Sequence, residues 1–311
     1  MAAALCFMMQ ATAQTQFATL VHNDTLSSFT GVDALSEAMA AAADGDVITL
    51  SSGTFNGCTI SKAITIRGAG MEADEQGRQT IISGTITVNN PKEDMAIEGL
   101  FISNKLDFST LGINIYLNKC IINSVDLKKN SYGGTRGFII TNCKIKTMNQ
   151  TRSGTIDLNT YNSYYESVQG QERYRFDNCI VKDVLSSAVL TGNFYNCIYM
   201  GSKPFINTAD HCVTTFAVDA DHGSNNYVVE DVTTLFNNYD AEATWYTRDL
   251  TLTDEAKATY LGSDGTEVGI YGGSLPFSPW LDRPVIKRLT VAPKSSKNGK
   301  LSVDIEVSET E

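Results

Sequence analysis

Short apolar phrases recur along most of the chain, each closed by a polar or small residue. Apolar residues alternate in VITL (47–50), ITI (64–66), ISGTITV (82–88) and IEGLFIS (97–103). Alternation of period two predicts β-strands with one buried face. Repetition of the same phrase predicts a solenoid, in which each strand stacks on its copy in the next coil. Further on a cysteine joins the phrase, in LNKCII (117–122), TNCKIK (141–146), DNCIVK (177–182), YNCIYM (195–200) and DHCVTT (210–215).

One stretch of helical period precedes the strands. Val32, Leu35 and Met39 form an apolar stripe at helical spacing. Thr30, followed by Asp33 three residues later, predicts a capping box that satisfies free backbone N–H groups at the helix start. The sequence DGD (44–46) predicts the turn that ends this helix.

The order of these elements resembles a known family. A helix followed by DGDVITLSSGTF (44–55) and ISKAITIRGAG (60–70) resembles the N-terminal cap and first coils of pectin-lyase-like right-handed parallel β-helix proteins. DGTEVGIYGG (264–273) resembles a motif that closes the β-helix in exported bacterial members. The resemblance implies an all-β fold, a right-handed single-stranded parallel β-helix over residues 31–272 with an N-terminal capping helix.

A C-terminal tail is expected over residues 283–311. The alternating runs VIKRLTV (285–291) and KLSVDIEV (300–307) flank Asn298-Gly299, which predicts a β-hairpin. The tail is interpreted either as a cap over the last coil, which would cover an open sheet edge, or as the start of a truncated β-sandwich.

The recurring cysteines are interpreted as part of the repeat. A small apolar thiol packs like any core residue, and the preceding asparagine tolerates the left-handed conformation of a tight turn. Stacked neighbours would lie about 4.8 Å apart, so an occasional disulfide stays open as an alternative. Zinc is disfavoured because the sequence has no C-x₂₋₄-C pair.

Composition and the N-terminus bear on location and partners. Residues 1–13 are interpreted as a signal peptide with an incomplete basic region, ending at Ala11-Thr12-Ala13, which predicts a protein that is secreted or held at the cell surface or in the periplasm. The net charge of −11 argues against nucleic acid. It also disfavours a polyanionic glycan unless Ca²⁺ or a local basic patch bridges the like charges. No apolar run predicts a membrane span, and the oligomeric state stays open.

The resemblance implies polysaccharide lyases, hydrolases and esterases, but their motifs are missing. There is no D-D pair, no R-x-K and no G-x-x-D-F, and the acids near His222 fall within less than one coil. A Ca²⁺-dependent lyase needs carboxylates for the metal and an unprotonated base. The candidates are Asp219, Asp221 and Asp231 for a metal, with Arg136, Arg173, Arg175 or His222 as the base.

The sequence leaves two functions open, and its aromatic residues bear on the first. Aromatic residues gather between 161 and 199, and Tyr161, Tyr164, Tyr165 and Tyr174 in or beside the insertion 160–175 are candidates for stacking on sugar rings. The first function is a glycan-contacting or structural surface protein without established catalysis. The alternative is a polysaccharide lyase or glycoside hydrolase acting on an acidic plant or host polysaccharide. No cofactor is established by the sequence, and Ca²⁺ stays open.

Overall fold

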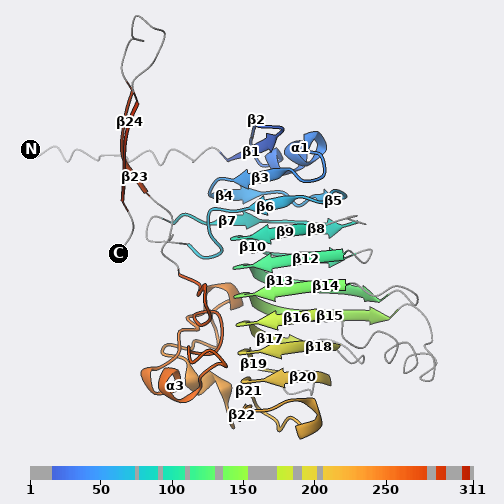
Figure 1. The fold of residues 1–311 in the computed structure, drawn as a ribbon, viewed down its shortest axis with the longest axis vertical. Coiled ribbons are helices and arrows are strands. Elements are labelled where there is room, and N and C mark those ends of the chain that lie inside the picture. The colour runs from blue at the N-terminus through green and yellow to red at the C-terminus, as the bar shows by residue number, and fades with distance from the viewer. Residues whose placement is uncertain are drawn as a thin grey trace, which may run out of the picture.

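The main body of the protein is a stack of mostly parallel β-strands, seen in the computed structural model (Figure 1). The strands form two long sheets, named sheet A and sheet B below. The structure describes residues 16–73, 77–89, 94–108, 113–129, 136–152, 174–184, 191–201, 206–278, 285–291 and 303–308. The expected signal peptide, residues 1–13, lies outside them.

Sheet A has ten strands in the order β2-β1-β3-β6-β9-β12-β14-β16-β18-β20. From β3 onward all neighbours are parallel, whereas β1 pairs antiparallel with both β2 and β3 at the N-terminal end. The strands are β1 (Phe17–His22), β2 (Thr25–Thr30), β3 (Val47–Leu50), β6 (Thr65–Arg67), β9 (Met95–Glu98), β12 (Ile113–Asn118), β14 (Arg136–Thr141), β16 (Tyr174–Asp177), β18 (Thr191–Tyr195) and β20 (Ile206–Asp210).

Sheet B has twelve strands, all parallel. The long strand β13 pairs with both β10 and β11, so two short strands of one coil become a single strand in the next. The strands are β4 (Gly53–Phe55), β5 (Thr59–Ile60), β7 (Thr80–Ile82), β8 (Thr85–Val88), β10 (Phe101–Ile102), β11 (Lys105–Phe108), β13 (Ile121–Lys129), β15 (Lys144–Arg152), β17 (Ile180–Val184), β19 (Ile198–Tyr199), β21 (Val213–Thr214) and β22 (Tyr227–Val228).

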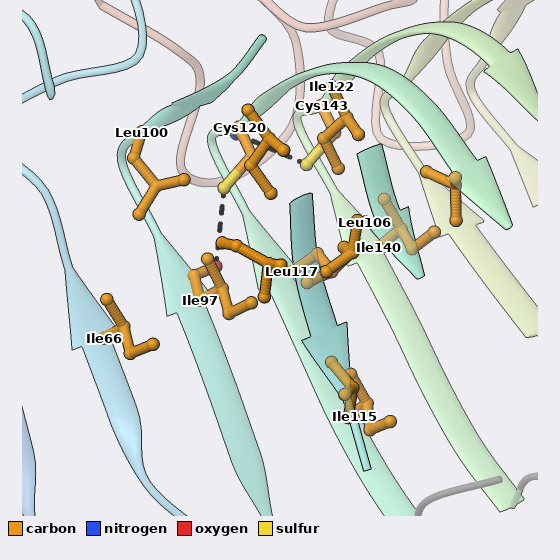
Figure 2. Packing of buried hydrophobic residues seen from close by; sticks show 14 of the residues in the cluster. Ile66, Ile97, Leu100, Leu106, Ile115, Leu117, Cys120, Ile122, Ile140 and Cys143 are labelled. Carbon is orange, nitrogen blue, oxygen red and sulfur yellow. Dashed lines mark hydrogen bonds between the residues drawn. The ribbon is translucent and has the colours of Figure 1, made fainter. Parts of the chain in front are cut away.

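The chain alternates between the two sheets, so equivalent residues of successive coils stack in rows, as in a β-helix-like solenoid. This confirms the expectation of an all-β stack built from the repeated phrases. Every second side chain points inward, and the inward ones form the main core. One inner row, part of which is visible in Figure 2, consists of Ile48, Ile66, Ile97, Leu117, Ile140, Phe176, Phe194 and Ala209.

The recurring cysteines form a column inside this core, called the cysteine column below, and none of them is in a disulfide. The backbone N–H of Cys120 donates to Sγ of Cys143 at 3.4 Å, and that of Cys179 donates to Sγ of Cys197 at 3.3 Å (Figure 2 shows the first pair). The thiols are therefore packing residues, as the repeat predicted. The column contains Cys120, Cys143, Cys179, Cys197 and Cys212, all buried.

The residue before each stacked cysteine makes the turn from sheet A to sheet B in the left-handed conformation. Its φ is 50° at Lys119, 48° at Asn142 and 52° at Asn178, and the two later turns at Asn196 and His211 are similar, with φ of 56° and 52°. Asparagine enters this region more readily than most residues, which explains its frequent place before the cysteine.

A second core lies on the outside of sheet B, where residues 230–278 pack against the stack; they are called the C-terminal segment below (Figure 1, orange). Leu250, Leu252 and Ile270 of this segment are buried with Ile121 and Ile180 of sheet B. The sheet therefore buries both faces there. The short elements after β20 are η1 (Ala220–His222), η2 (Val232–Leu235), η3 (Trp245–Thr247) and α3 (Asp254–Thr259).

The predicted termini are confirmed in part. Helix α1 spans Ala34–Ala41, but its N-cap is Asp33 and no side chain caps it, so the capping box at Thr30 is wrong. Asp33 instead accepts a hydrogen bond from Nδ2 of Asn56 at 2.8 Å. Towards the C-terminus, the side chain of Thr253 caps the start of α3. Strand β23 (Val285–Val291) pairs antiparallel with β24 (Val303–Ser308), as the predicted hairpin requires.

Candidate functional site

On sheet A between β12 and β20, the outward side chains that the structure describes are half-buried or exposed, and the surface they form is called the outer face below. Strand register aligns them in two rows. Tyr116 is the most exposed aromatic residue of the two rows, with 38% of its surface accessible. The first row is Tyr116, Ile139, Arg175, Asn193 and Thr208, and the second is Asn118, Thr141, Asp177, Tyr195 and Asp210.

The cysteine column is the sequence signal that locates these rows. Residues four and two positions before each stacked cysteine point outward, and the residue three positions before it points inward. Tyr195 therefore lies on the outer face, whereas its neighbour Phe194 is buried and stacks on Phe176 with ring centroids 4.3 Å apart. The sequence analysis grouped these aromatic residues together because it did not use their distance from the following cysteine to assign each one to the inward or outward face.

Arg175, Asp177 and Tyr195 form a cluster on the outer face. Nε of Arg175 donates to Oδ2 of Asp177 at 2.7 Å, and its guanidinium lies 4.7 Å from the ring centroid of Tyr195. The carboxylate and the ring hold the guanidinium from two directions, which orients it. Arg175 side-chain exposure is 39%, so the cluster reaches solvent.

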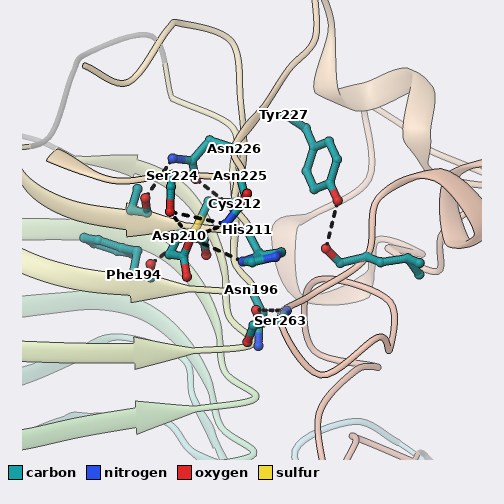
Figure 3. A network of polar contacts seen from close by, with 12 residues as sticks. Phe194, Asn196, Asp210, His211, Cys212, Ser224, Asn225, Asn226, Tyr227 and Ser263 are labelled. Carbon is teal, nitrogen blue, oxygen red and sulfur yellow. Dashed lines mark hydrogen bonds and ion pairs between the residues drawn. The ribbon is translucent and has the colours of Figure 1, made fainter. Parts of the chain in front are cut away.

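A polar network surrounds Asp210, which pairs with Tyr195 in the strand register (Figure 3 shows the network). Oδ1 of Asp210 accepts from Oγ of Ser224 at 3.0 Å and from Nδ2 of Asn225 at 3.3 Å. Nδ1 of His211 lies 3.3 Å from the same oxygen. The backbone N–H of His211 donates to the carbonyl of Ser224 at 3.3 Å, but among the described residues no hydrogen bond joins the imidazole to Oγ of Ser224, which donates to Asp210. This geometry therefore does not activate the serine as a nucleophile.

The predicted base candidates do not assemble into a described site. Arg175 is paired with Asp177, and a guanidinium stays protonated in proteins, which excludes it as an unprotonated base at ordinary pH. His222 ends η1, but its side chain is not described, and neither is that of Arg136. Arg173 lies outside the described residues, as do Tyr161, Tyr164 and Tyr165. Tyr174 begins β16, and only its backbone is described.

The three predicted metal ligands are exposed and lie outside the β-strands, at positions between 219 and 231. Asp219 precedes η1, and Asp221 lies within it. Asp231 caps η2 by accepting from the backbone N–H and Oγ1 of Thr233, and these bonds lower the pKa of Asp231. Within the described ranges no three His, Cys, Asp or Glu side chains are grouped so as to hold a metal ion.

An ion-pair cluster on sheet B was missed by sequence reasoning. Nζ of Lys105 lies 3.1 Å from Asp126 and 3.4 Å from Asp107, which belong to adjacent coils. The hydrogen bond to Asp126 is the main cause that raises the pKa of Lys105. This lysine therefore carries a proton and serves to neutralise the two acids, and it is not a general base.

A buried lysine lies where the C-terminal segment meets sheet B. Lys144 interrupts the apolar outward row between Ile121 and Ile180 and has an exposure of 1%. Its Nζ contacts Glu72 at 3.1 Å and donates to the carbonyl of Arg248 at 2.8 Å. Burial lowers the pKa of Lys144, although the charge of Glu72 opposes this shift. A substrate has no contact surface on an ammonium enclosed in this way, so its role is to bind the segment.

Comparison with known proteins adds no family: no family model, no curated protein and no solved structure matches this chain. In the described part of the chain, no helix is both long and apolar enough to cross a membrane. Only the surface chemistry of the described residues therefore indicates a function.

Proposed function

We propose that the protein is an exported glycan-contacting surface protein that binds its ligand on the outer face of sheet A, without catalysis. We further propose that the stack is a right-handed parallel β-helix of the pectin-lyase-like kind. Right-handed crossovers between parallel strands are nearly universal, and the repeat with its asparagine turns supports this assignment.

The observation that carries the proposal is the arrangement of Tyr116, Arg175 and Tyr195 on a rigid sheet. Tyrosine offers an apolar ring face and a polar edge, which suits the C–H faces and hydroxyls of sugars. Asn118, Asn193 and Thr208 add amide and hydroxyl groups in the same rows. Successive strands lie about 4.8 Å apart, so an extended polymer along the stack would meet new partners at each coil.

Three cations of the polar clusters described above are held in ways that suit structure better than proton transfer. Lys105 and Arg175 are neutralised by carboxylates, and Lys144 is enclosed. A general base needs an accessible lone pair at the operating pH, and none of these three cations offers one. A protein that holds a polymer along a rigid face needs no such group.

The test is binding to an immobilised panel of neutral and acidic glycans, compared for wild type, Tyr116→Ala, Tyr195→Ala and Tyr246→Ala. Tyr246 lies in the C-terminal segment and is 40% exposed, which matches the 38% of Tyr116, so it controls for loss of a surface aromatic. We expect the first two variants to bind the retained glycan about tenfold more weakly, since an aromatic contact contributes about 1.4 kcal/mol.

Two results would contradict the proposal. One is a folded wild-type protein that retains none of the glycans. The other is equal weakening by Tyr246→Ala, which would mean that the outer face is not the contact surface. Release of reducing ends or of unsaturated products from any glycan in the panel would replace the binding function with an enzymatic one.

A further inference from the structure

Two lysines stand side by side on sheet B, away from the outer face. Lys146 of β15 and Lys182 of β17 are opposite each other, because the flanking residues pair as Ile145 with Val181 and Thr147 with Asp183. Adjacent parallel strands lie about 4.8 Å apart, so the two side chains start from neighbouring positions. Both are half-buried, which leaves them accessible at the surface.

Neither ammonium group is neutralised by contact within the described residues. Lys105 has two carboxylate partners and Lys144 has Glu72, but no hydrogen bond or ion pair is formed by Lys146 or Lys182 there. Like charges held next to each other repel, and proteins usually separate or pair them. The unpaired arrangement is unusual in a chain with a net charge of −11.

A third cation belongs to the segment that packs beside these strands: the backbone carbonyl of Arg248 accepts from Nζ of Lys144 at 2.8 Å, and Lys144 lies two residues before Lys146 on β15. The charge of Arg248 acts on Lys182, and after burial it is the next cause that lowers the pKa of Lys182, followed by Lys146. Arg248 is fixed in place, since Nε donates to the carbonyl of Ala243 at 3.0 Å and Nη1 donates to Oη of Tyr239 at 2.7 Å. Asp183 acts in the opposite direction on Lys182 and is the weakest of these influences.

We propose that Lys146 and Lys182 form a binding site for an oxyanionic group, a carboxylate, sulfate or phosphate, with Arg248 supporting the positive charge from the C-terminal segment. A bound oxyanion accepts hydrogen bonds from both ammonium groups and removes their mutual repulsion. The site is the local basic patch that an acidic ligand needs on a protein of net negative charge. It lies on a different sheet from the outer face, so it does not depend on the proposed glycan contact there.

The experiment measures oxyanion affinity by titration calorimetry at constant ionic strength, with chloride as the reference anion. Sulfate, phosphate and polygalacturonate are titrated into wild type, Lys146→Gln, Lys182→Gln and Lys257→Gln. Lys257 is exposed on α3, so Lys257→Gln is the control that removes the same charge away from the proposed site. We expect each variant of the pair to bind about tenfold more weakly, because a charge-assisted hydrogen bond is lost, and Lys257→Gln to bind like wild type.

Each outcome decides the question. Tighter binding of polygalacturonate than of sulfate or phosphate assigns the site to polymer carboxylates, and the reverse order assigns it to a free oxyanion. No binding above chloride, or equal weakening by Lys257→Gln, overturns the proposal. A second readout uses the wild-type protein alone: acylation of Lys146 and Lys182, followed by mass spectrometry, is slowed by a bound oxyanion, while acylation of Lys257 is unchanged.

Discussion

Asn142 joins the turn of one coil to the C-terminal segment, and its replacement tests how the segment is held. Its Nδ2 donates to the carbonyls of Ile270 at 2.9 Å and Gly272 at 3.0 Å, across more than a hundred residues of sequence. The side chain is 3% exposed. Its backbone has φ of 48°, so the residue has a conformational role and a bonding role at once.

Two substitutions separate these roles. Asn142→Gly keeps the left-handed turn but loses both hydrogen bonds, and at about 1 kcal/mol each the free energy of unfolding falls by about 2 kcal/mol. Asn142→Ala loses the same bonds and also places a Cβ in the left-handed region, which costs a further 1–2 kcal/mol or so, for about 3–4 kcal/mol in total. The difference between the two variants measures the cost of the left-handed turn for alanine, less the greater unfolded-state freedom of glycine.

Lys119 provides the matched control at the same turn one coil earlier. Its φ is 50°, and no hydrogen bond from its side chain is formed within the described residues. Lys119→Gly removes the left-handed cost but adds unfolded-state entropy, so we expect a change of less than about 1 kcal/mol.

Urea unfolding followed by tryptophan fluorescence measures these changes, because Trp245 is buried in the C-terminal segment. Hydrogen exchange at Gly269 and Gly272 reports the local opening of the same segment. We expect both amides to exchange faster in Asn142→Gly and to be unchanged in Lys119→Gly. If Asn142→Gly costs no more than Lys119→Gly, the two side-chain bonds do not hold the segment and the reasoning is refuted.

Two further predictions concern buried groups. Glu72→Gln should lower the free energy of unfolding by about 2 kcal/mol, because it leaves the ammonium of Lys144 buried without its carboxylate, whereas Lys144→Met should change the free energy of unfolding by less than about 1 kcal/mol. Urea unfolding of both variants measures these changes, and equal destabilisation by the two would contradict the prediction. Burial raises the pKa of Cys179 and Cys197, so both thiols should resist alkylation at pH 8 until the protein unfolds. Alkylation followed by mass spectrometry measures this, and rapid labelling of either thiol in the folded protein would contradict the prediction.

The placement of side chains on the outer face was encoded in the sequence but was not extracted from it. The cysteine marks the inward position after the turn, and strand alternation then assigns the preceding residues to the two faces. Tyr195 and Arg175 follow from that rule. The ion pairs of Lys105 do not, because they depend on which residues of adjacent coils come into register.

The sequence by itself determined the stacked strands, the buried thiols, the asparagine turns and the terminal hairpin, because each depends on periodicity or on the backbone preference of one residue. The start of α1 was misplaced, since Thr30 belongs to β2 and the helix begins only after Asp33. Tertiary structure alone decided that residues 230–278 cover sheet B, that Lys144 is enclosed and that Lys146 meets Lys182. These contacts join residues far apart in the chain, and no local pattern of apolar and polar positions specifies such pairings.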